Sequence, residues 1–275
     1  MRGLASDAWE FAATGTRWRV HHGGTLKAAA ARELAAAVRR DEARWSPERR
    51  DSELCALNRA AGRWHAVSFE TFALVRACER FRVATAGVVN PLSGGVELDA
   101  EQCRVRLSPG GALELGGVGK AWIAQRLAAL AARLSDDPGL LIDAGGDLLA
   151  VSGRHVVAVE DPEAPQGVPL CWLALEPGQA VATSRPGARH RLAGDAEESR
   201  DPFEAVAGSG AAPAQATVLA GDAVSAAVQA RVLALRPGRI HVFALPGLVH
   251  VRGRAHASAA WGDALTAAPH PLRAA

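Results

Sequence analysis

The sequence predicts an α+β fold, with mixed sheets and helices packed against them. Stretches with apolar residues at helical spacing are interleaved with short alternating stretches, so both kinds of element are expected. Some strand-like stretches follow one another without a helix between them, which favours hairpins over a doubly wound parallel sheet. With 275 residues, 49% of them hydrophobic, the chain can bury a substantial core. We expect one domain over residues 1–275.

The first half of the chain is predicted to be mainly helical. Ser68 is a plausible N-cap for a helix that ends at Gly87. Proline and glycine are frequent over 88–112, where only CRVRL alternates as a strand does. The other elements predicted here are a strand over 16–22, a long helix over 26–45 and a short helix over 53–58.

The second half is predicted to be richer in strands. A helix follows Lys120, and PGLLIDAGGDLLAVSG indicates a buried strand followed by a double-glycine turn. Residues 185–214 combine charge, glycine and proline, and are interpreted as a loop. The remaining predicted elements are strands at 155–160, 171–176, 179–184 and ATVLAG, a helix at 222–235, and a closing hairpin of IHVFAL with LVHVRG.

Composition excludes several classes of function. The net charge of +2 gives no electrostatic footprint for nucleic acid. No run of about 18 apolar residues predicts a membrane span, and MRGLASDAWEF lacks the apolar core of a secretion signal. The four cysteines show no metal-type spacing and are interpreted as reduced thiols. A cytoplasmic location is therefore expected.

The stretch LELGGVGKAW (113–122) combines features of an anion site. Gly116, Gly117 and Gly119 precede or adjoin Lys120, which is one of two lysines in the chain, and a helix begins there. Glycines allow close backbone approach, a helix start presents unpaired N–H groups, and lysine adds a positive charge. A phosphate-loop motif is excluded, because Glu114 stands at its first glycine and Ala121 follows the lysine. The alternative is an ordinary glycine turn with a solvated lysine.

LELGGVGKAW resembles the "LDLGGIAKG" segment of the FAD:protein FMN transferases, the ApbE-type family. Further segments resemble that family in the same order, from about residue 11 to 236. These are FAATGTRWRV, RWSPERRDSELCALN, TAGVVNPLSG, LLIDAGGDLLAVSG, VATS and ATVLAGDAVSAAVQARVLAL. The resemblance implies a fold of the flavin-transferase type that binds FAD. It also implies transfer of FMN to a threonine of an acceptor flavoprotein, or cleavage of FAD to FMN and AMP, with magnesium.

The resemblance also implies binding residues, and each has a structural alternative. For Glu53 and Asn58 the alternative is helix capping, for Asn90 a turn before proline, and for Asp147 a bond to its own turn. Thr183 and Ser184 could reach the nucleotide or simply end a strand. The complete set of expected FAD-binding residues is Ser46, Glu53, Asn58, Asn90, Gly116, Gly117, Val118, Gly119, Lys120, Asp147, Thr183 and Ser184.

Several family features are missing from the sequence. The positions of the magnesium ligands, an aspartate and a threonine in the family, are Ala227 and Arg231 here, so the metal's protein ligands are expected to be lost. Gln125 replaces an aspartate, and the histidine that serves transfer has only His190 as a local candidate, at a different offset. Arg231 and His190 are therefore the candidate catalytic residues. A catalytically degenerate protein that binds FAD or a protein partner is the alternative to an active transferase.

Overall fold

The structure, a computed structural model of the chain, describes residues 7–163, 168–185, 215–251 and 253–267. Its largest element is an eight-stranded sheet with the strand order β1-β2-β8-β9-β12-β13-β14-β15. Neighbouring strands in this order are antiparallel. Their bounds are β1 Asp7–Ala13, β2 Thr16–His22, β8 Leu141–Ala144, β9 Leu148–Ala150, β12 Ala180–Ser184, β13 Gln215–Ala220, β14 Gly247–Val251 and β15 Arg254–Ala257.

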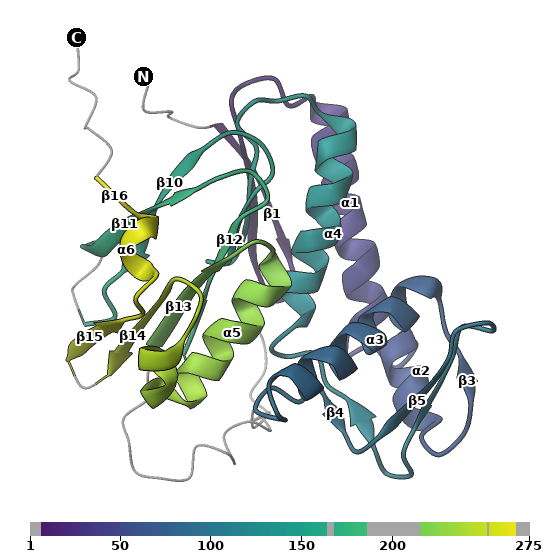
Figure 1. Ribbon diagram of the computed structural model, residues 1–275. Helices are drawn as coiled ribbons and strands as arrows, with labels where there is room; N and C mark the ends of the chain where they lie inside the picture. Colours follow the sequence, from purple (N-terminus) through teal and green to yellow (C-terminus); the bar gives the residue numbers. More distant parts are fainter. Residues whose placement is uncertain (1–6, 164–167, 186–214, 252, 268–275) are drawn as a thin grey trace.

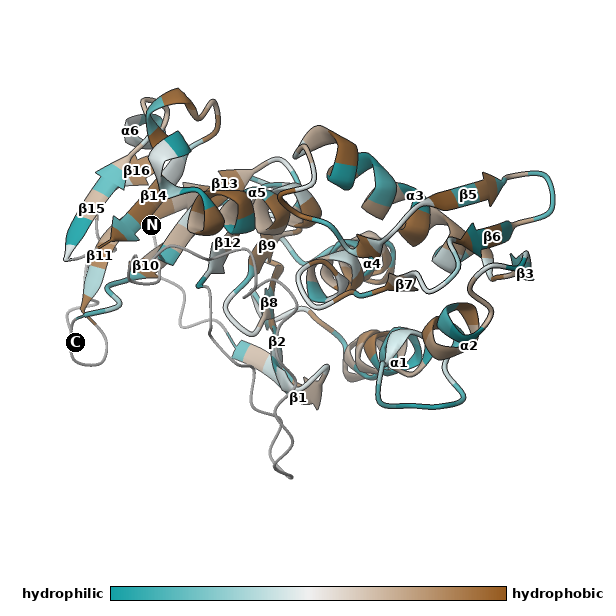
Figure 2. Cartoon of the chain, turned by 90° about the horizontal axis from the view of Figure 1, so that it is seen from below, coloured by the Kyte–Doolittle hydropathy of each residue, from teal (hydrophilic) through white to brown (hydrophobic). Residues whose placement is uncertain are grey.

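Three helices bury one face of this sheet. Helices α1 (Ala28–Trp45) and α4 (Gly119–Leu134) run side by side, and α5 (Ala223–Leu235) packs against β12 and β13 (Figure 1). Alternate strand residues such as Trp18, Ile142 and Val218 are fully buried in the core that the helices cover. In Figure 2 the central strands and α5 are coloured mainly as hydrophobic, as expected for elements that lie between other layers.

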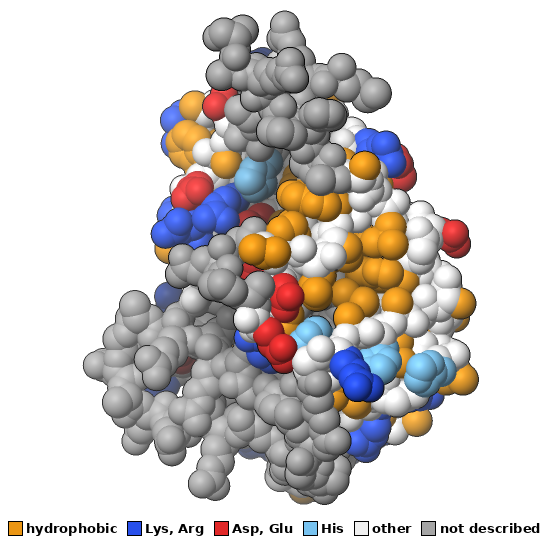
Figure 3. All heavy atoms as spheres, turned by 90° about the vertical axis from the view of Figure 1, so that its left-hand side faces the viewer, with side chains coloured by type: hydrophobic (Ala, Val, Ile, Leu, Met, Phe, Trp, Pro, Cys, Tyr) orange, Lys and Arg blue, Asp and Glu red, His pale blue; other side chains and the backbone are white. Residues whose placement is uncertain are grey.

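A smaller sheet covers part of the opposite face. It consists of β10 (His155–Glu160), β11 (Pro169–Leu175) and β16 (Leu265–Thr266), and α6 (Trp261–Ala264) lies beside it. Its inward residues form a second core with the alternate residues of β8, β9, β12, β13 and β14. Figure 3 faces this side of the molecule, where apolar side chains gather near the centre.

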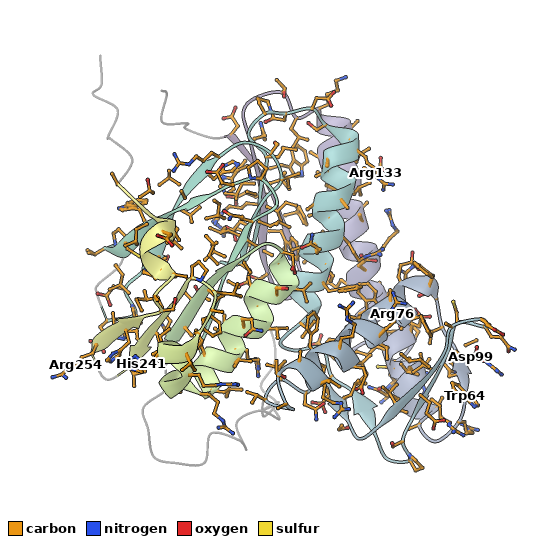
Figure 4. All side chains as sticks on the ribbon, viewed as in Figure 1. Trp64, Arg76, Asp99, Arg133, His241 and Arg254 are labelled. Atoms are coloured by element: carbon orange, nitrogen blue, oxygen red, sulfur yellow. The ribbon has the colours of Figure 1, made fainter. Side chains whose placement is uncertain are left out.

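A third group of elements lies at the far end of α1 and α4. Ser52 and Ser68 accept the backbone N–H groups of Cys55 and Thr71, and so cap α2 and α3. Trp64 and Asp99, labelled in Figure 4, lie at the outer edge of this group. The elements are α2 Glu53–Arg59, β3 His65–Ala66, α3 Phe69–Ala84, β4 Leu92–Ser93, β5 Val96–Asp99, β6 Arg104–Leu107 and β7 Ala112–Leu113.

The predicted α+β class is confirmed, and so are most of the predicted elements. The closing hairpin is different. Residues 237–242 form a 3₁₀ helix, η2 (Pro237–Val242), and the hairpin joins β14 to β15. Pro237 favours a helical first turn, and Ile240 is buried. The antiparallel partners of β14, which contains LVHV, are therefore β13 and β15, not IHVFAL.

Two further observations concern the predicted loop and the membrane. Most of the predicted loop, residues 186–214, lies outside the described residues. Within the described part of the chain, no helix combines the length and the apolar character needed to cross a bilayer.

Candidate functional site

The glycine turn leads directly into the first turn of α4, as the sequence predicted. Helix α4 begins at Gly119, and the N–H groups of Val118 and Gly119 donate to Leu115 O, at 3.0 and 2.7 Å. The Gly119 N–H is thus already used to close the turn. Within the described residues, the N–H groups of Lys120 and Ala121 have no acceptor, as is usual at a helix start.

The Lys120 side chain turns toward the double-glycine turn between β8 and β9. Its Nζ lies 3.8 Å from Asp147 Oδ2 and donates to Ala144 O at 3.5 Å. Both side chains are only 19% exposed. Burial raises the pKa of the Asp147 carboxyl above its ordinary value, although Lys120 acts in the opposite direction. The lysine is therefore a partly buried, paired cation and not a solvated one.

Two glycines shape the turn that carries Asp147. Gly145 has φ +72°, and an added Cβ there would lie 2.3 Å from Thr16 Oγ1. Gly146 has φ +99° and donates its N–H to Asp143 Oδ1 at 2.8 Å. Asp143 in turn pairs with Arg19 at 3.2 Å. These contacts set the turn against β2 and direct Asp147 toward Lys120.

The end of β12 lies beside the same turn. Thr183 N–H donates to Asp147 Oδ1 at 3.3 Å, and its hydroxyl lies 2.9 Å from Thr217 Oγ1 on β13. Ser184 pairs with Ala216 across the two strands. The structure therefore brings Thr183, Asp147 and Lys120 together, so that segments from three parts of the chain meet at the start of α4.

Arg231, on α5, reaches the glycine turn at Gly117. A Cβ added to Gly117 would lie 3.0 Å from Arg231 Cδ, 3.2 Å from Nη1 and 3.3 Å from Nε. The arginine side chain therefore lies across the backbone of Gly117. The segment 117–120 therefore has two cationic side chains, Lys120 itself and Arg231 against Gly117.

Asn58 and Asn90 brace the segment that enters the glycine turn. The Asn58 amide accepts from Leu113 N at 2.8 Å and donates to Leu113 O at 3.0 Å. Asn90 Oδ1 accepts from Leu92 N at 3.2 Å, and the adjoining Pro91 O accepts from Glu114 N at 2.8 Å. Both asparagines therefore have structural contacts next to the candidate site.

Ser46 and Glu53 lie where α1, α2 and α3 meet. Ser46 Oγ accepts from Glu48 N at 3.2 Å. Glu53 accepts from the Ser68 hydroxyl at 2.7 Å, from the Ser68 N–H and from the Thr71 hydroxyl. Burial would raise the pKa of Glu53, but these donors and the nearby Arg44 hold it below its ordinary value. Glu53 thus holds the start of α3 through its N-cap residue Ser68 and through Thr71.

Three contributors were not among the predicted site residues. Gln125 Oε1 accepts from Ala223 N at 2.9 Å and so ties α4 to the start of α5. Thr16 packs on Gly145, and Trp122 Nε1 is buried without an acceptor among the described residues. A long-range contact such as Gln125 to Ala223 leaves no periodic signal in the sequence. His190 lies outside the described residues.

The described residues contain no cluster of three or more histidine, cysteine, aspartate or glutamate side chains that could hold a metal. Loss of the magnesium ligands stays a prediction. Ala227 has no ligand atom and Arg231 is cationic, whereas Mg²⁺ requires oxygen ligands in a near-octahedral arrangement.

The chain is similar to known proteins over most of its length. The model of the ApbE family matches residues 14–97 and 93–239. The ApbE protein of Thermotoga maritima has a TM-score of 0.79 at 19% identity, covering 95% of this chain and 100% of that one. The flavinyl transferase ApbE of Pseudomonas stutzeri has a TM-score of 0.72 at 14% identity, with coverages of 95% and 98%. The flavin transferase ApbE of Vibrio cholerae has a TM-score of 0.72 at 17% identity, with coverages of 94% and 99%. No curated protein gives a sequence match.

Proposed function

Because the chain belongs to the ApbE family, we propose that it binds FAD and transfers FMN from it to a threonine of an acceptor flavoprotein, or splits FAD to FMN and AMP. The observation that carries this proposal is the glycine turn at the start of α4, where Lys120 follows the turn and Arg231 lies against Gly117. We assign the FAD pyrophosphate to residues 116–120.

The chemistry of this helix start suits a pyrophosphate. The N–H groups of Lys120 and Ala121 are available, and the helix dipole adds partial positive charge at the same end. Transfer of a phosphoryl group depends chiefly on positioning and on neutralising the charge of the phosphate oxygens. Arg231 and Lys120 together supply two positive charges for this purpose.

Binding of the pyrophosphate requires Lys120 to contact a phosphate oxygen as well as Asp147. The ammonium now lies 3.8 Å from Asp147 Oδ2, and it has three protons on a flexible stem. A phosphate oxygen at the helix start can therefore become a second partner without complete loss of the first. Asp147 acts in this arrangement as a positioning residue that holds the lysine beside the turn.

The test removes both members of this pair. In Lys120→Met with Asp147→Asn, no buried carboxylate loses its partner, so the fold is better preserved than in Lys120→Met alone. We expect FAD affinity to fall by about 1.5–3 kcal/mol, roughly 10- to 150-fold, in a flavin-fluorescence titration. Lys27→Met is the matched control, because Lys27 is exposed before α1 and its loss should leave affinity unchanged. Unchanged FAD affinity in the double variant would contradict the assignment of the pyrophosphate to this turn.

The second candidate function is binding of FAD or a protein partner without transfer. The observation that favours it is the poor fit of Ala227 and Arg231 to magnesium. Incubation with FAD, divalent metal and an acceptor flavoprotein separates the two functions. FMN, AMP or a flavinylated acceptor indicates an enzyme, whereas bound and intact FAD indicates the degenerate alternative.

A further inference from the structure

The contact between Arg231 and Gly117 fixes a positive charge at the glycine turn. Three atoms of the arginine side chain lie within 3.0–3.3 Å of the place where a Gly117 Cβ would be. No methyl group fits there unless the arginine moves by a few tenths of an ångström. The absence of a side chain at Gly117 is therefore what admits the guanidinium to the backbone.

The position of Arg231 is set by helix packing. The Asp222 carboxylate caps α5 by accepting from Ser225 N at 2.7 Å, and Gln125 Oε1 accepts from Ala223 N. Gln125 belongs to α4, so this hydrogen bond joins α4 to α5. It therefore fixes the position of the Arg231 guanidinium relative to the glycine turn. Ala227 lies one turn before Arg231 on the same face of α5.

We propose that the Arg231 guanidinium is the permanent counter-charge for the FAD pyrophosphate, so that nucleotide binding by this chain needs no divalent metal. The inference rests on the proposed FAD site. A guanidinium keeps its charge at all physiological pH values and donates two parallel hydrogen bonds to phosphate oxygens. A hard cation at this place would meet a positive side chain and, among the described residues, no cluster of ligating carboxylates.

The first experiment measures FAD affinity of the intact protein in EDTA and in excess magnesium. We expect equal affinity in both. If the protein binds FAD only with magnesium, the inference is overturned while the proposed FAD site stands. If it binds FAD under neither condition, the proposed function itself fails. The two failures are thus distinguishable.

The second experiment changes the side chain. Arg231→Thr should weaken metal-free FAD binding by about 10- to 100-fold, because a charge-assisted pair of hydrogen bonds is lost. Arg231→Lys should recover part of the affinity, since it keeps the charge but not the two-pronged geometry. Arg236→Thr is the control, because Arg236 is exposed at the end of α5 and should leave affinity unchanged. Equal affinity of Arg231→Thr and the unmodified protein would overturn the inference.

Two further variants test the geometry. Gly117→Ala should reduce metal-free affinity by displacing the guanidinium, whereas Gly238→Ala, where a Cβ meets nothing within 4 Å, should not. In Ala227→Asp with Arg231→Thr, an aspartate and a threonine share one helical face, so binding should return only when magnesium is added. Circular dichroism establishes that each variant is folded. Metal-independent binding by this double variant would contradict the assignment of the charge to Arg231.

Discussion

Asp137 connects the end of α4 to the loop between β2 and α1. Its carboxylate accepts from Gly23 N at 2.8 Å, Thr25 N at 2.8 Å, Thr25 Oγ1 at 2.7 Å and Gly139 N at 2.9 Å. The residue is only 2% exposed. Burial alone would raise its pKa, but the four donors lower it to about 2. In Asp137→Asn the charge is lost and one accepting oxygen becomes an NH₂ group, so we expect a less stable protein.

The magnitude follows from the pKa. A fall from 3.8 to about 2 corresponds to about 2 kcal/mol of stability, which we reduce to about 1–2 kcal/mol because the surrounding loops lie near solvent. Since the folded pKa is the lower one, this stability is fully present above the unfolded value of 3.8 and is lost as pH falls through about 2. At pH 3 about half of the effect should already be absent.

Urea unfolding of both proteins at pH 7 and pH 3 provides the assay. The difference in free energy of unfolding should be about 1–2 kcal/mol at pH 7 and smaller by roughly half at pH 3. Asp136→Asn is the matched control, because Asp136 is the exposed neighbour of Asp137 and the same charge is removed. A difference that does not depend on pH would refute the reasoning from the lowered pKa.

Two other predictions concern the glycine turn before Asp147 and the buried thiol of Cys78. Gly145→Ala should destabilise the protein by about 2–5 kcal/mol in urea unfolding, because positive φ and the close Thr16 both oppose a methyl group. Gly146→Ala, with positive φ but open space around the added methyl group, should lower the free energy of unfolding by only about 1–2 kcal/mol. An equal loss in both variants would contradict a steric effect of Thr16 at Gly145. Burial raises the pKa of the Cys78 thiol to about 12, so alkylation at pH 8 should spare Cys78 until the protein unfolds. Peptide mass spectrometry detects this, and labelling of Cys78 in the folded protein would contradict its burial.

The elements that sequence predicted well depend on local patterns. Helix α1 has apolar residues at helical spacing, and α3 begins at the expected Ser68 cap. The error at IHVFAL arose because alternation can describe a strand or a 3₁₀ turn with one buried residue, and only the pairing of β14 with β13 and β15 decides between them. A local pattern therefore predicts whether a stretch forms a helix or a strand better than it predicts which strand pairs with it.

The candidate site was predictable in part for the same reason. Lys120 at a helix start follows from local sequence, whereas its pairing with Asp147 depends on where a distant turn folds back. Sequence could suggest that Arg231 belongs to the site, through the resemblance of its helix to the family. It could not give the contact with Gly117, because the two residues lie far apart in the chain and no periodicity relates them.

Arg231 is attached to the chain and cannot leave with a product. A bound metal ion can dissociate together with a nucleotide. A guanidinium stays in the site and attracts the phosphate of the product as strongly as it attracted the phosphate of the substrate. Release must then depend on the shorter product making fewer contacts elsewhere, or on Lys120 returning to Asp147. We expect the lifetime of the product complex, and not the capture of FAD, to limit turnover in any reaction at this site.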